Sequence, residues 1–96
     1  MKKTIEAKDG TKITYRLPNV IELFELQHNS EWGKEGNSGY GMIAKILTHA
    51  EPFIVSVKGS KKTWAACLED RSMADELSTL ALSLIKDEVG EEEKKS

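Results

Sequence analysis

The first stretch of the chain, residues 3–17, alternates apolar and polar positions in a way that predicts two strands joined at Asp9-Gly10. A two-residue turn there would put Ile5 and Ile13 on opposite faces of the hairpin. A three-residue loop that starts at Lys8 and ends on a left-handed glycine bulge pairs Ile5 with Ile13 instead. We prefer the bulged loop because one face then carries all the apolar residues, Ile5, Ala7, Ile13, Tyr15 and Leu17.

Helical spacing follows the hairpin. Pro18 ends the second strand, and Asn19 with Glu22 three positions later has the spacing of a capping box. We expect the helix that follows to be well buried, because it is apolar around much of its circumference. Its apolar residues are Val20, Ile21, Leu23, Phe24 and Leu26. A long glycine-rich loop, residues 29–41, then leads to a second helix that begins at Met42 and ends or kinks at Pro52.

The sequence pattern of the second half of the chain predicts two further helices. Residues 53–57 are rich in β-branched side chains and fit either a third strand or a short buried helical turn. A short amphipathic helix after Gly59-Ser60 carries Trp64, Cys67 and Leu68 on one side. Ser72 is expected to cap the last helix, with Asp75 at the third position. The apolar residues of that helix recur at helical spacing: Met73, Leu77, Leu80, Ala81, Leu84 and Ile85.

These elements predict an α+β fold, mostly helical, in which the N-terminal hairpin packs on a small bundle of about four helices. The length of 96 residues allows one domain, assigned to residues 1–90. Residues 91–96 form a charged tail with no apolar side chain, which we expect to be disordered.

Composition narrows the class of protein. The net charge is −2, which gives no large positive field for nucleic acid, and no apolar run approaches the length of a membrane span. No secretory signal is evident, and the single cysteine, Cys67, cannot form an intramolecular disulfide. We therefore expect a cytoplasmic protein that does not associate with membranes.

No complete catalytic or metal motif is present. His28 and His49 lie near the predicted ends of two helices and are not spaced as a close ligand pair. Cys67 lies on an apolar helical face, which favours a small core residue over a reactive thiol. We expect no catalytic residue, no bound metal and no cofactor, and rate a small hydrolase or metal enzyme lowest among the alternatives.

The glycine-rich loop admits two ligand-binding interpretations. Residues 36–41 precede a helix and could cradle a phosphate on backbone amides, although neither the Walker nor the dinucleotide pattern is met. Residues 33–36 have the G-x-x-G spacing of the loop with which KH domains clamp RNA. A small nucleic-acid-binding regulator, using Gly33–Gly36 and the basic hairpin, is therefore the alternative function. We favour a flexible connection.

The same loop carries two large aromatic residues, Trp32 and Tyr40. Each either folds back over the core or anchors a partner, because aromatic side chains bury a large area at low entropic cost. A domain this small cannot cover all its apolar helical surface, so we expect some of it to form an interface. The candidate partner-binding residues are Trp32, Tyr40, Leu23, Leu26, Leu77 and Leu84.

Several loose motifs across most of the chain carry a resemblance to a known family. They are Ile5-Glu6-Ala7-Lys8-Asp9-Gly10-Thr11, Leu17-Pro18-Asn19 before Ile21-Glu22-Leu23, Ala50-Glu51-Pro52-Phe53-Ile54 with Gly59, Thr63-Trp64 with Leu68-Glu69-Asp70, and the terminal leucine-rich helix. In this order of elements the chain resembles the tail assembly chaperones of long-tailed bacteriophages, which hold the tape-measure protein before the tail tube assembles around it. Residues 33–41 depart from that pattern.

The resemblance implies a non-catalytic protein in the host cytoplasm whose apolar surface shields a long helical client from aggregation. It also implies assembly into a homo-oligomer and, in many members, a longer frameshifted form. It assigns no catalytic residues.

Overall fold

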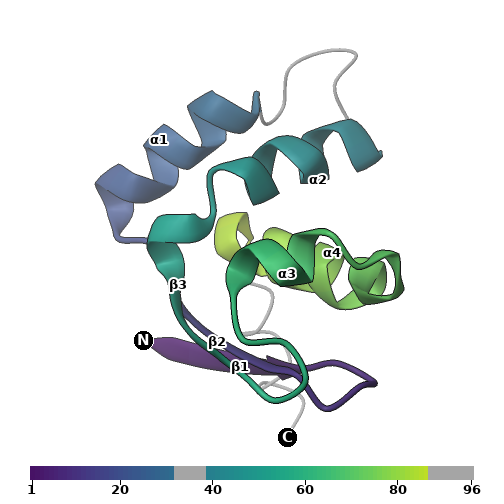
Figure 1. Cartoon of the computed structure of the whole chain (residues 1–96). Coiled ribbons are helices and arrows are strands. Elements are labelled where there is room, and N and C mark those ends of the chain that lie inside the picture. Colours follow the sequence, from purple (N-terminus) through teal and green to yellow (C-terminus); the bar gives the residue numbers. More distant parts are fainter. Residues whose placement is uncertain (32–38, 87–96) are drawn as a thin grey trace, which may run out of the picture.

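A three-stranded antiparallel sheet and the helices on one side of it make up the computed structural model, which describes residues 1–31 and 39–86 (Figure 1). The strands are β1 (Lys2–Glu6), β2 (Lys12–Arg16) and β3 (Ile54–Lys58), in the order β1-β2-β3. The helices of the described part are α1 (Val20–Ser30), α2 (Gly39–Thr48), α3 (Trp64–Leu68) and α4 (Ala74–Ile85), with short 3-10 turns η1 (Glu51–Phe53) and η2 (Arg71–Met73). The predicted α+β, mostly helical fold is confirmed.

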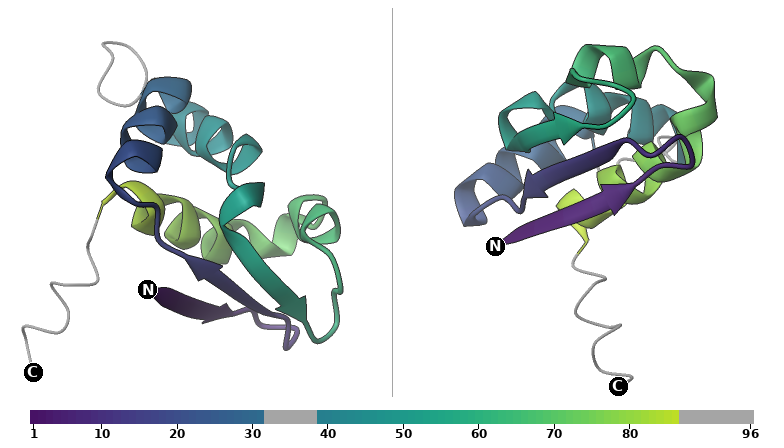
Figure 2. Two further views of the ribbon diagram at one scale, coloured as in Figure 1. Left: turned by 90° about the vertical axis from the view of Figure 1, so that its left-hand side faces the viewer. Right: turned by 60° about the horizontal axis from the view of Figure 1, so that its bottom comes forward.

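The helices are stacked on the sheet in layers. α4 lies between the sheet and the α1–α2 pair, and it contacts β1 on one side and both α1 and α2 on the other (Figures 1 and 2). α1 and α2 therefore lie on the far side of α4 from the sheet, and the start of α1 lies next to the end of β2. The buried apolar core comprises Ala7, Ile13, Tyr15, Leu26, Met42, Ile46, Ala50, Phe53, Trp64, Cys67, Met73, Leu77, Leu80, Ala81, Leu84 and Ile85.

The hairpin has the predicted register. Ile5 lies opposite Ile13, and Gly10 has a φ of 92°, the left-handed conformation that a bulged loop requires. The Gly10 backbone N–H donates to the Ala7 carbonyl over 3.0 Å, which closes the loop. The Ala7 N–H in turn donates to the Thr11 carbonyl over 2.8 Å.

Residues 53–57, which the sequence left undecided, fall at the end of η1 and in the third strand. β3 pairs with β2 so that Val57 lies opposite Ile13 and Ile54 lies opposite Tyr15. These pairs extend the apolar inner face of the hairpin. An irregularity in the register leaves Val55 unpaired and exposed.

A cluster of charges ties the hairpin loop to the segment before α4. The Lys61 ammonium lies 2.6 Å from a carboxylate oxygen of Asp9 and 2.6 Å from one of Asp70. The Ser60 hydroxyl donates to the Asp9 carbonyl over 2.7 Å. These bonds to Lys61, aided by backbone N–H donors, hold the pKa of both carboxyl groups at about 2.

Two sequence expectations need correction. The last helix is not capped by Ser72, because Asp70 accepts from the Ser72 backbone N–H over 2.9 Å and starts η2 instead. α4 then begins at Ala74. The second helix begins at Gly39, three residues earlier than expected, so Tyr40 lies in its first turn and not in a loop. The expected disorder of residues 91–96 concerns residues outside the described ranges, as do most of the glycine-rich loop and Gly33–Gly36.

Candidate functional site

α1 is fixed at its start by its own capping residues and by Arg16, the last residue of β2. The Asn19 side chain accepts from the Glu22 backbone N–H over 2.8 Å, and the Asn19 N–H donates to the Glu22 carboxylate over 3.0 Å. This is the predicted capping box. Arg16 donates to both oxygens of Glu22, over 2.8 and 2.9 Å, and its guanidinium lies 4.8 Å above the Phe53 ring.

The ion pair with Arg16 keeps the Glu22 carboxyl group ionised. Hydrogen bonds from the guanidinium, followed by the Asn19 N–H, lower the pKa of the Glu22 carboxyl to about 2. Glu22 is therefore ionised at any physiological pH and is already fully engaged within the chain. The capping box and the Arg16–Glu22 ion pair together fix the first turn of α1, and with it the direction in which the helix presents its side chains.

The inward face of α1 packs on α2 and α4. Leu26 and Ser30 are buried and Leu23 is half-buried, at positions i, i+3 and i+7 of the helix. These positions form a single stripe along an α-helix.

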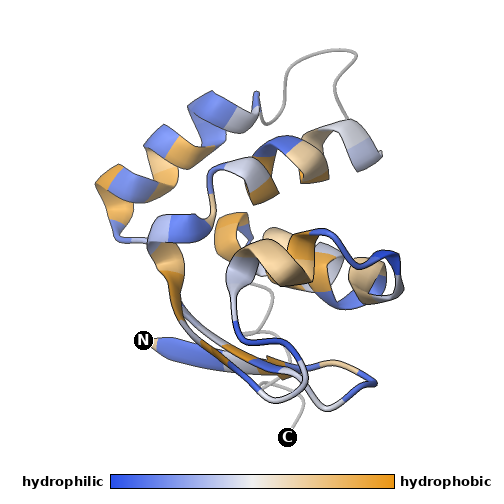
Figure 3. Cartoon of the chain, in the orientation of Figure 1, coloured by the Kyte–Doolittle hydropathy of each residue, from blue (hydrophilic) through white to orange (hydrophobic). Residues whose placement is uncertain are grey.

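The opposite face of α1 is apolar and exposed. Val20, Ile21 and Phe24 are 65%, 68% and 62% exposed. Their spacing of i, i+1 and i+4 puts them together on the side turned away from α2 and α4. We call these three side chains the outer face of α1. The apolar colour recurs along this helix in Figure 3.

The expectation that this helix is well buried is therefore wrong for half of its circumference. Among the helices and strands of residues 1–31 and 39–86, α2 and α4 make the main contacts with α1, and they leave Val20, Ile21 and Phe24 exposed. The related expectation, that some apolar helical surface remains exposed, is confirmed.

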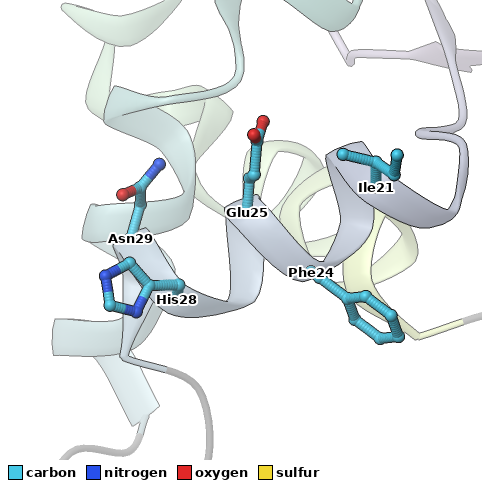
Figure 4. A pocket seen from close by; sticks show the side chains of 5 residues that line it. All are labelled: Ile21, Phe24, Glu25, His28 and Asn29. Carbon is cyan, nitrogen blue, oxygen red and sulfur yellow. The ribbon is translucent and has the colours of Figure 1, made fainter.

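A shallow hollow lies along the outer side of α1 and is drawn in Figure 4. Its lining residues are Ile21, Phe24, Glu25, His28 and Asn29. In that view the Phe24 ring projects from the helix on a different side from the Glu25 carboxylate. Glu25 and Asn29 also line a second hollow, whose far wall is formed by His49, Pro52 and Phe53. These two polar residues therefore separate the apolar hollow from a more polar one.

The carboxylates of this helix differ in their partners. Glu22 is bound by Arg16, and Glu31, just past the end of the helix, lies 2.9 Å from the Lys45 ammonium. Glu25 is exposed and makes no hydrogen bond or ion pair with residues 1–31 or 39–86. α1 contains no lysine or arginine. The outer side of α1 is thus apolar with one uncompensated negative charge at its border.

The candidate partner-binding residues do not form one surface in the structure. Leu26, Leu77 and Leu84 lie in the core and offer no surface, so their assignment to an exposed surface was wrong for the isolated chain. Leu23 is half-buried against that core. Tyr40 is 87% exposed on the first turn of α2. Trp32 lies outside the described residues.

The candidate list from the sequence did not include the three exposed apolar residues of α1, Val20, Ile21 and Phe24. The pattern of α1 contains two apolar stripes, and the inward one includes a serine, Ser30, which disguises it. The available signal was the capping box, which fixes where the helix begins, but it does not say which stripe meets α4.

The candidate metal ligands do not assemble into a site. No group of three or more His, Cys, Asp or Glu side chains in residues 1–31 and 39–86 has a metal-binding arrangement. His28 lies in the last turn of α1 and His49 directly follows α2, as predicted. Cys67 is buried as expected, and burial raises the pKa of its thiol.

Comparison with protein-family models, with curated proteins and with solved structures found no match for this chain. Within the described part of the chain, the helices are too short or too polar to cross a membrane.

Proposed function

We propose that this protein binds another protein through the outer face of α1, and that it serves as a phage tail assembly chaperone for a helical client such as the tape-measure protein. The observation that supports the proposal is the exposure of Val20, Ile21 and Phe24 on one side of a firmly capped helix. In this proposal the protein has no catalytic role and works in the host cytoplasm.

The energetics favour a partner on this face. Burying one large apolar side chain completely contributes roughly 1.5–3 kcal/mol. Val20, Ile21 and Phe24 are each about two-thirds exposed, so a partner that covered them would gain most of that amount from each. The cap and the Arg16 pair already hold the helix in place, so little further ordering of its backbone opposes binding.

The family resemblance points to the same region. Leu17-Pro18-Asn19 leading into Ile21-Glu22-Leu23 is one of the segments that carry it, and Ile21 belongs to the outer face. A chaperone that shields an aggregation-prone helix needs a stable apolar surface of this kind.

Co-expression tests this proposal. The full chain is produced together with a tape-measure protein as the candidate client, and the soluble fraction of that client is measured. We expect the wild-type chain to keep the client soluble and the double variant Ile21→Ser, Phe24→Ser to fail.

The matched control is the double variant Val55→Ser, Leu68→Ser, whose side chains are 45% and 43% exposed on other elements. It should behave as the wild type. Equal solubility with both double variants, each folded by circular dichroism, would show that the outer face of α1 does not hold the client.

Nucleic-acid binding is the second candidate function, and the outer face of the sheet favours it. Lys12 lies opposite Lys58 there, and the exposed Lys2 extends the basic surface. Two observations weaken this candidate. Glu6 lies opposite Lys12 and adds a negative charge to the face. The described residues of this face also include no aromatic side chain on which a base could stack. Binding to nucleic acid that falls steeply with added salt would support this candidate.

A further inference from the structure

The charge beside the outer face of α1 identifies a class of partner. We propose that the occupant of this face is an amphipathic helix of another protein, with an apolar stripe that covers Ile21 and Phe24 and a lysine or arginine beside the stripe that pairs with Glu25. This inference rests on the proposed function and goes further, because it names the chemistry of the client.

Glu25 supplies the selectivity. Its carboxylate makes no ion pair within the described residues, whereas the neighbouring Glu22 and Glu31 are each paired with a cation of the chain. It borders the apolar hollow directly, since it lines that hollow together with Ile21 and Phe24. A cation next to the apolar stripe of a partner would reach Glu25 while the stripe covers the outer face, and the Asn29 side chain is placed to accept a further hydrogen bond.

The shape of the surface indicates a helical occupant. The exposed side chains lie on a convex helix of 11 residues, which is about 16 Å long at 1.5 Å per residue. Ridges formed by residues four apart, as Val20 and Phe24 are, fit the grooves of a second helix. A partner helix of about three turns would span the face.

The same charges disfavour the other occupants. The α1 of a second copy would bring another Glu25 and no lysine or arginine to the contact. The outer face of a second copy's sheet is basic, but its paired positions carry charged residues, threonine and serine, which offer no apolar stripe. An anionic membrane or a nucleic acid would be repelled by Glu25.

Two peptides of about 14 residues, long enough for a helix of more than three turns, provide the test. Both have the same leucine stripe at helical spacing, and the flanking positions are lysine in one and glutamate in the other. Fluorescence anisotropy of the labelled peptide, titrated with the full chain, gives the dissociation constant. The chain variants are Glu25→Lys and the matched control Glu69→Lys, a charge reversal at an exposed residue on α3's C-terminal cap.

We expect the wild-type chain to bind the lysine peptide more tightly than the glutamate peptide. Glu25→Lys should weaken the lysine peptide by about fivefold and tighten the glutamate peptide by a similar factor, the size of an exposed ion pair. Glu69→Lys should leave both dissociation constants unchanged. The preference should shrink as salt is added.

Three results would overturn the inference. The first is equal binding of the two peptides, and the second is an equal effect of Glu25→Lys and Glu69→Lys. In both cases, loss of binding in the Ile21→Ser, Phe24→Ser variant would leave the proposed function standing, because the face would still hold helices without selecting their charge. The third is binding of neither peptide, or a dimer of the chain alone that Phe24→Ser dissolves. Peptide binding that survives the double serine variant would remove the proposed function as well.

Discussion

The hydroxyl of Tyr15 lies 2.8 Å from the hydroxyl of Ser83, in a buried contact that joins β2 to α4 across 68 positions of the sequence. Ser83 also donates its proton to the Leu80 carbonyl over 3.0 Å. Ser83 must therefore accept from Tyr15, which fixes the direction of the bond. A polar link thus connects the sheet with the helix layer that supports α1.

The direction of this bond predicts unequal effects of removing either partner. Tyr15→Phe deletes the donor and leaves Ser83 bonded to Leu80, so it should cost about 1 kcal/mol of unfolding free energy. Ser83→Ala strands the buried Tyr15 hydroxyl and should cost more, roughly 1–3 kcal/mol. Urea unfolding of the two variants measures both values. A smaller loss for Ser83→Ala than for Tyr15→Phe would contradict the assignment.

Two glycines with positive φ should respond differently to a methyl group. Gly10 has φ of 92° and nothing within 4 Å of an added Cβ, so Gly10→Ala should cost about 1 kcal/mol from backbone strain alone. Gly59 has φ of 107°, and its added Cβ would lie 2.5 Å from the Gly10 carbonyl oxygen. Gly59→Ala should therefore be clearly the more destabilising change. Thermal unfolding of both variants under one buffer condition compares them directly.

Acid should weaken the fold through Lys61 and its two carboxylates. The pKa of Asp9 and the pKa of Asp70 are each lowered from 3.8 to about 2, so the folded chain binds fewer protons than the unfolded chain between these values. Stability is thus fully present above about pH 5 and is lost as the pH falls toward 2. The urea midpoint of the Lys61→Ala variant should therefore decrease less between about pH 5 and pH 2 than that of the wild type. The control Lys62→Ala, at an exposed neighbour, should show the full decrease.

The cap of α1 should contribute measurably to stability. Asn19→Ala removes the acceptor for the Glu22 backbone N–H and should cost about 1 kcal/mol. Asn29→Ala, at an exposed asparagine of the same helix, is the matched control and should have little effect. Equal urea midpoints for the two variants would mean that the Arg16 pair alone fixes the helix entry.

The elements that depend on local chemistry were predictable from the sequence. The pairing of Ile5 with Ile13 follows from the alternation of apolar residues, and the helix start follows from Asn19 and Glu22. These rules act over a few residues and need no knowledge of the rest of the chain.

The elements that depend on distant partners were not predictable in the same way. Residues 54–58 form a strand because β2 offers Ile13 and Tyr15 as partners some forty positions away. Ser72 loses the capping role because Asp70, itself held by Lys61, starts an earlier turn. The outer face of α1 was hidden for the same reason, since only the position of α4 decides which of two apolar stripes is buried.

Backbone amide shifts of the isotope-labelled full chain, recorded by NMR during titration with a soluble fragment of the co-expressed helical client, test the central claim most directly. We expect the largest changes at α1, from Val20 to Asn29, with the outer face of the sheet around Lys2 and Lys12 unaffected. Changes confined to the sheet, with the amides of α1 unmoved at saturation, would contradict the assignment of α1 as the binding surface.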